Sequence, residues 1–134
     1  MIVSNILNAI KKLNSKINDL QGKILYENTS GTTGTVTLSD SSSNYKYLEI
    51  FYRSNDDLYG SIKVSNPNGK DIVIVSAIPH NNSNNCYLKS TSLNINSNKI
   101  TVNSYSEVAL KSNGELTVDT DKNCIYITKV LGYI

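Results

Sequence analysis

The sequence predicts a mainly β fold, in which a short N-terminal coiled-coil helix precedes an antiparallel, jelly-roll-like β-sandwich. Three observations lead to this prediction. Residues 1–24 carry a heptad repeat of apolar positions. From residue 25 onward, short strand-like runs are separated by clusters of Gly, Asn, Ser and Asp. The length of 134 residues suits one domain with a short extension. We therefore divide the chain into a stalk, residues 1–24, and a head, residues 25–134.

The apolar residues of the stalk recur in alternating steps of three and four, as in a coiled coil. The a positions are Val3, Ile10, Ile17 and Ile24, and the d positions are Ile6, Leu13 and Leu20. A helix of about Val3–Gln21 is expected, with Gly22 marking its end. We predict that these seven residues form an oligomer interface. Docking of the helix on its own head is the alternative, although a docked helix usually has a wider apolar face.

The flanking positions favour a parallel assembly, because an antiparallel pair would set the g-position lysines of two chains against each other. The number of chains is less sharply specified. Ile at a with Leu at d favours dimers. Ile6 at a d position, Leu7 at e and Ala9 at g widen the seam and favour a trimer.

The head is expected to contain ten short strands. They are Lys23–Glu27, Thr35–Leu38, Tyr45–Arg53, Leu58–Val64, Asp71–Ile78, Cys86–Ser92, Lys99–Tyr105, Glu107–Lys111, Glu115–Val118 and Cys124–Leu131. The Asn-Gly pairs at 68–69 and 113–114 each predict a tight hairpin, since both turn residues tolerate a positive φ. In the last strand, Ile125, Ile127 and Leu131 are predicted to face the core. The continuous apolar run 72–75 needs cover on both faces, as a central strand or by contact with another subunit.

Composition and charge exclude several classes of protein. Asn, Ser and Thr number 19, 18 and 10, so uncharged polar side chains dominate. The stalk holds four lysines and one aspartate, whereas the head holds nine basic and ten acidic residues, with Arg53 as the one arginine. A near-neutral head argues against nucleic-acid binding. No apolar run is long enough for membrane insertion, the N-terminus lacks the order of a secretory signal, and two cysteines suit a reducing cytosol.

The search for catalytic or metal-binding residues is negative. One histidine, His80, is too few for a histidine metal site or a catalytic triad. Asp119, Asp121 and Asn123 have the spacing of a calcium loop, but the glycine and the closing glutamate are missing, so a hairpin turn is expected there. We predict no enzymatic activity, no metal and no cofactor. A small glycan hydrolase is the least favoured alternative, because clustered carboxylates are scarce.

Surface recognition remains as the expected function. Tyrosine offers amphipathic contact area, and Asn and Asp offer hydrogen bonds to hydroxyl groups. Two loops combine these residue types, and their candidate ligand-binding residues are Asn55, Asp56, Asp57 and Tyr59 in the first and Asn82, Asn85 and Tyr87 in the second. A half-buried structural role is the alternative for any one tyrosine.

Three segments resemble small virion proteins of tailed bacteriophages of the fibre, baseplate or head-fibre type: "LQGKILYENTSGTTGTVTLSD", "NYKYLEIFYRSND" and "CIYITKVLGYI". The resemblance lies in the order of a heptad segment and a β head. It implies a parallel homotrimer on the virion surface, synthesised in the cytoplasm of a bacterial host. It also implies contacts with other virion proteins and binding of a host-surface ligand such as a glycan. A decoration or assembly protein that binds no host ligand is the alternative.

Overall fold

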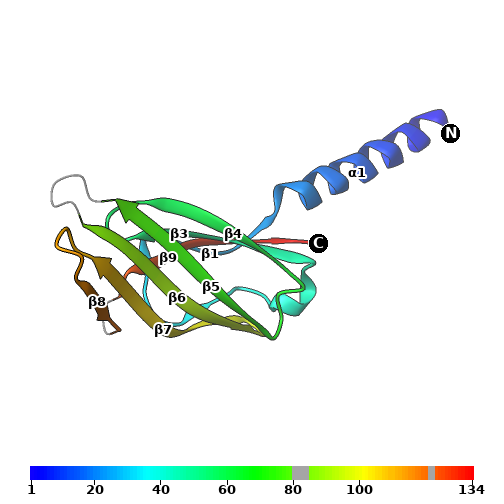
Figure 1. Ribbon diagram of the computed structural model, residues 1–134. Helices are drawn as coiled ribbons and strands as arrows, with labels where there is room; N and C mark the ends of the chain where they lie inside the picture. The colour runs from blue at the N-terminus through cyan, green and yellow to red at the C-terminus, as the bar shows by residue number, and fades with distance from the viewer. Residues whose placement is uncertain (80–84, 121–122) are drawn as a thin grey trace.

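The computed structural model describes residues 1–79, 85–120 and 123–134. Over these ranges the chain forms one α-helix, one short 3-10 helix and nine strands (Figure 1). Their bounds are α1 (Ile2–Gln21), β1 (Lys23–Thr32), β2 (Val36–Thr37), η1 (Ser42–Asn44), β3 (Tyr47–Ser54), β4 (Tyr59–Ser65), β5 (Lys70–Pro79), β6 (Cys86–Asn96), β7 (Lys99–Leu110), β8 (Leu116–Asp119) and β9 (Ile125–Tyr133). The prediction of a mainly β chain with one N-terminal helix is confirmed.

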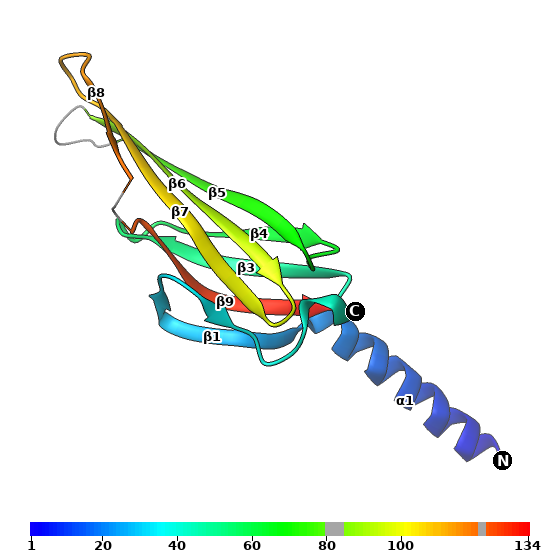
Figure 2. The same ribbon diagram turned by 90° about the horizontal axis from the view of Figure 1, so that it is seen from below.

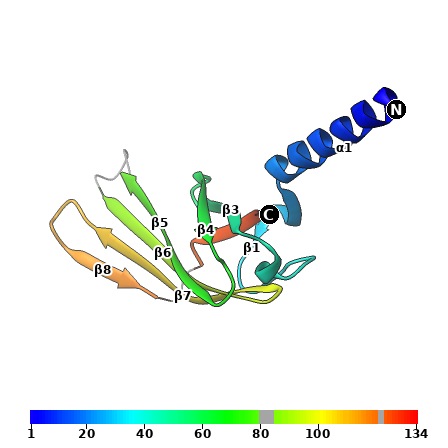
Figure 3. The same ribbon diagram turned by 90° about the vertical axis from the view of Figure 1, so that its right-hand side faces the viewer.

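The strands form two antiparallel sheets, which Figure 3 shows as two layers. The smaller sheet has the order β1-β9-β3-β4, and the larger has β2-β7-β6-β5 with β8 also paired to β7. Side chains from both sheets fill the space between them, including Leu48 and Ile50 from β3 and Leu93 and Ile95 from β6. Removal of this apolar surface from water is the main force that holds the two layers together.

The strand order differs from the jelly-roll-like arrangement that was expected. A jelly roll is built from two Greek keys. Here β3 and β4 form a local hairpin, and β5, β6, β7 and β8 form a meander of sequence neighbours. The pairings of β1 with β9, of β3 with β9 and of β2 with β7 join distant parts of the chain. The predicted strands Lys99–Tyr105 and Glu107–Lys111 are a single strand, β7, because nothing at Ser106 interrupts the pairing with β6.

The hairpin predicted at Asn68-Gly69 is wrong, since β4 and β5 lie in different sheets. The segment instead crosses from one sheet to the other. The Asn68 side chain accepts a hydrogen bond of 2.8 Å from the backbone N–H of Ser97, in the β6–β7 turn. Gly69 has a φ of 74°, but Pro67 before the pair is buried and cannot donate a ladder hydrogen bond. The Asn113-Gly114 hairpin between β7 and β8 is confirmed, with a positive φ at Gly114 alone.

The register of β9 also corrects one core residue. Ile125 and Ile127 are buried as predicted, but the next core residue is Val130 and not Leu131. In the pairing with β3, Phe51 lies opposite Lys129 and Tyr52 lies opposite Ile127, so β9 carries one extra residue. Such a bulge reverses the side-chain alternation beyond it.

Strand β5 lies at the edge of the larger sheet, so the central-strand interpretation of the run 72–75 is wrong. Ile74 is buried in the core, whereas Val73 and Val75 point outward and are 57% and 51% exposed. The other interpretation, contact of the outer face with another subunit, stays a prediction.

Helix α1 projects away from the head instead of docking on it (Figures 1 and 2). No residue of α1 is buried. The helix ends at Gly22, whose φ is 72°, and a Cβ at this position would lie 2.7 Å from the Tyr133 ring. Ile24 was assigned to the heptad repeat, but it lies in β1, half-exposed beside the junction with the helix.

Asp40 joins the segments on either side of it at the stalk end of the head. Its carboxylate accepts hydrogen bonds from Tyr45 Oη at 2.8 Å, the backbone N–H of Ser41 at 2.8 Å and Asn44 Nδ2 at 2.9 Å, and it pairs with Lys23 Nζ at 3.4 Å. These donors, Tyr45 first, lower the pKa of Asp40 from 3.8 to about 2.

Replacement of Asp40 by asparagine is expected to weaken the pH dependence of stability in acid. A carboxyl group whose pKa is lower in the folded chain stabilises the fold above pH 3.8, and this stabilisation disappears as the pH falls toward 2. The unfolding temperature of wild type should therefore fall over that pH range. The unfolding temperature of Asp40→Asn should be lower than that of wild type at pH 7 and should fall less over the same range. Asp57→Asn, at an exposed carboxylate, is the control. Equal slopes for wild type and Asp40→Asn would contradict the assignment.

Candidate functional site

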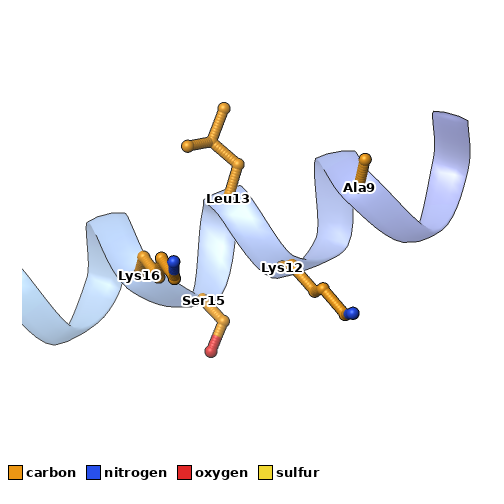
Figure 4. A pocket seen from close by; sticks show the side chains of 5 residues that line it. All are labelled: Ala9, Lys12, Leu13, Ser15 and Lys16. Carbon is orange, nitrogen blue, oxygen red and sulfur yellow. The ribbon is translucent and has the colours of Figure 1, made fainter.

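The first candidate surface is the apolar stripe of α1. Its a and d residues are exposed to between 42%, at Ile17, and 79%, at Leu20. Figure 4 shows Leu13 and Ala9 on one side of the helix, with Lys12 and Ser15 directed to the other. A shallow hollow of about 470 Å³ lies along this part of the helix. An isolated helix of 20 residues is marginal in water unless its apolar stripe is buried, so this surface is a candidate interface.

The stripe meets the head at a second hollow of about 390 Å³. The last turns of α1 supply Lys16, Asp19 and Leu20, and the smaller sheet supplies Tyr47 and Tyr133. The two tyrosine rings stack with their centroids 4.5 Å apart. Tyr133 Oη also donates a hydrogen bond of 3.2 Å to Glu49. The base of the stalk therefore adjoins an ordered aromatic pair.

The second candidate surface is the distal end of the sandwich, opposite α1 (Figures 1 and 2). Lys89 of β6 is at its centre, with only 3% of its side chain exposed. Its Nζ atom contacts Asn55 Oδ1 and Asp56 Oδ2 in the turn between β3 and β4 of the smaller sheet, and it lies 3.4 Å from Glu107 Oε2 of β7. The Tyr87 ring centroid is 5.9 Å from the same nitrogen. A buried lysine thus bridges the two sheets.

The structure brings together four of the seven predicted ligand-binding residues. Asn55 and Asp56 contact Lys89, Tyr87 lies beside it, and Asn85 hydrogen-bonds Tyr87 Oη at 3.5 Å. Asn85 Oδ1 also accepts the Ser112 backbone N–H at 3.1 Å, which links this loop to the β7–β8 turn.

The other three predicted residues do not join this group. The Asp57 carboxylate turns toward Arg53, 3.6 Å away, and is 80% exposed. Tyr59 instead lines a hollow of about 340 Å³ with Glu27, Phe51 and Lys129 on the smaller sheet. Asn82 lies outside the described residues, as do His80 and Asp121 of the metal-site search. Within residues 1–79, 85–120 and 123–134, no cluster of three or more His, Cys, Asp or Glu residues could hold a metal ion.

The outer face of the larger sheet forms a third surface, at its distal half. Cross-strand pairing aligns Ala77, Leu88, Val108 and Val118 in one row and Cys86, Leu110 and Leu116 in the next. Most of these side chains are exposed, and none of them is charged. Exposed apolar patches of this kind mark contacts with other proteins more often than with polar ligands.

Comparisons with known proteins add no identity to these surfaces. The chain matches no protein-family model, and the search of curated proteins found no similar protein either. Among the described residues, no helix has the length and apolar character needed to cross a membrane.

Proposed function

We propose that this chain is a fibre-type or receptor-binding protein of a tailed bacteriophage, which assembles through its helical stalk as a parallel homotrimer. The observation that carries the proposal is the exposed a/d stripe of α1 on a helix that stands away from its head. A parallel stalk places all heads at one end of the assembly and directs their distal ends away from it. This arrangement suits display on a virion surface.

The distal end of the head is the proposed ligand-binding surface. It lies farthest from the stalk and presents the amide of Asn85, the ring of Tyr87 and the partly exposed carboxylate of Asp56. Amides, carboxylates and aromatic rings together suit a hydroxyl-rich ligand such as a host-surface glycan. The proposal includes no catalytic step, because Asp56 and Glu107 both pair with Lys89.

A second candidate function is decoration or assembly of the particle without a host ligand. The uncharged apolar rows on the larger sheet favour it, since they suit a neighbouring virion protein better than a sugar. The two functions differ in what the assembled protein binds.

Glycan-array binding of the labelled, assembled chain separates them. We expect binding of at least one host-surface glycan, weakened at least about tenfold by Tyr87→Ala, since an aromatic contact of this kind is worth about 1.5 kcal/mol. Ser43→Ala, at the stalk end, is the control and should bind as wild type does. Absence of any glycan or host-cell binding by an assembled wild type would favour the decoration function.

A further inference from the structure

The buried group around Lys89 combines three chemical functions in one place. Lys89 carries a primary amine, Asn55 a carboxamide and Glu107 a carboxyl group, whose side chain is 10% exposed. The amine nitrogen contacts the carboxamide oxygen of Asn55, which places it beside the carbonyl carbon of that amide. The carboxamide therefore adds an electrophilic carbonyl group to the amine and carboxylate of an ion pair.

We propose that Lys89 and Asn55 condense into an intramolecular isopeptide bond, with Glu107 carrying protons. The bond would join β6 of the larger sheet to the residue that follows β3 of the smaller sheet. This inference goes beyond the proposed function, because it concerns a covalent modification of the head and does not depend on the stalk or on a ligand.

The reaction balances without any added reagent. The ammonium of Lys89 passes one proton to the carboxylate of Glu107, and the resulting neutral amine attacks Cγ of Asn55. A new C–N bond forms, the original Cγ–Nδ2 bond breaks, and a second Lys89 proton leaves with Nδ2 as ammonia. The third proton stays on the new amide nitrogen. Little water reaches this position, because the side chains of Lys89 and Glu107 are only 3% and 10% exposed.

Both reacting side chains are held on ordered backbone. Lys89 lies within β6, opposite Glu107 on β7 and Ser76 on β5. Asn55 donates its backbone N–H to the Cys124 carbonyl at 3.0 Å. The following turn is fixed by the Ser54 hydroxyl, which accepts the backbone N–H groups of Asp56 and Leu58 at 3.2 and 3.3 Å. Because both reacting groups are held close together, their reaction is effectively unimolecular and does not depend on a diffusional encounter.

Asn55 is the acceptor that the chemistry favours over Asp56. Both contact the Lys89 nitrogen. A carboxylate anion resists attack by an amine and has no neutral leaving group, whereas a carboxamide can release ammonia. Asp56 is also the more exposed carboxyl group, at 35% against 10% for Glu107. Its place beside the nitrogen suits charge compensation for the ammonium before the reaction.

Intact-mass spectrometry of the full-length, denatured protein tests the bond directly. Wild type should be lighter than its calculated mass by one molecule of ammonia, and a proteolytic digest should contain the peptide of Lys89 joined to that of Asn55. Peptide mapping is required because Asn-Gly pairs can lose ammonia by forming a succinimide. Full calculated mass would overturn the proposal. Loss of one water molecule, with Asp56 in the linked peptide, would overturn the assignment to Asn55.

Variants then assign the roles of the three residues. Lys89→Met and Asn55→Ala should have their full calculated masses, whereas the control Lys111→Met should keep the deficit, because Lys111 pairs with Glu115 elsewhere. Glu107→Gln should be unlinked or linked far more slowly. A complete link in Glu107→Gln would overturn the proton-carrier role. A link that persisted in Asn55→Ala would overturn the acceptor.

The bond would also act as a staple between the sheets. It closes a loop of 34 residues in sequence separation, which includes β4 and β5. A cross-link over a loop of this size should raise the unfolding temperature by roughly 10–20 °C. Wild type should therefore unfold that much above Asn55→Ala, and equal unfolding temperatures would overturn the stapling role.

Discussion

Ile17→Asp is expected to dissociate the assembled protein into monomers. Ile17 is an a position near the middle of α1 and is the least exposed of the heptad residues, at 42% in the single chain. In a parallel stalk it would face its own copies, so the substitution would bury like charges with no partner. Burial of unpaired charge costs several kcal/mol, enough to dissociate a seam only 20 residues long.

Sedimentation equilibrium measures this effect. Ser15→Asp is the matched control, because it places the same charge on the side of α1 away from the stripe (Figure 4). The control should remain assembled, and the head of Ile17→Asp should stay folded by circular dichroism. Equal masses for wild type and Ile17→Asp would show that the stripe is not the interface.

Leu93→Ala is expected to destabilise the head by about 3 kcal/mol, whereas Leu88→Ala should cost less than about 1 kcal/mol. Both leucines lie on β6, but Leu93 is 1% exposed in the core and Leu88 is 47% exposed on the outer face. The same atoms are removed in both variants, so the difference reports burial alone.

Urea unfolding of the isolated variants at equal concentration measures both free energies. A cost at Leu88 as large as that at Leu93 would mean that the outer face of the larger sheet is buried. In a dilute monomer this would contradict the register of β6, and in an assembly it would indicate a subunit contact on that face.

The helix and most strands could be predicted because their signals are local. A 3-4 apolar spacing specifies α1, and the alternation of Leu48 and Ile50 with outward residues specifies β3. The Asn68-Gly69 prediction failed because turn chemistry does not reveal which sheet the next strand will join. The Leu131 prediction failed because a bulge adds one residue to β9, and the apolar pattern of the sequence does not reveal where a bulge lies.

The candidate site was half predictable for a similar reason. Asn55, Asp56, Asn85 and Tyr87 were selected from loop composition, and the topology brings them to one end. Lys89 and Glu107 were missed because the usual alternation is inverted there: Leu88 and Val108 face outward, while the charged residues beside them face inward. The signal that could have found them is that they lie directly opposite each other on β6 and β7. To use this signal one must know the register of β7, a 12-residue strand that the sequence pattern divides into two strands.

The mass of the wild-type chain in solution tests the central proposal most directly. Sedimentation equilibrium over a range of micromolar concentrations should give three times the chain mass of 14.8 kDa. A single species of 14.8 kDa at every concentration would contradict the stalk assembly and, with it, the fibre-type function.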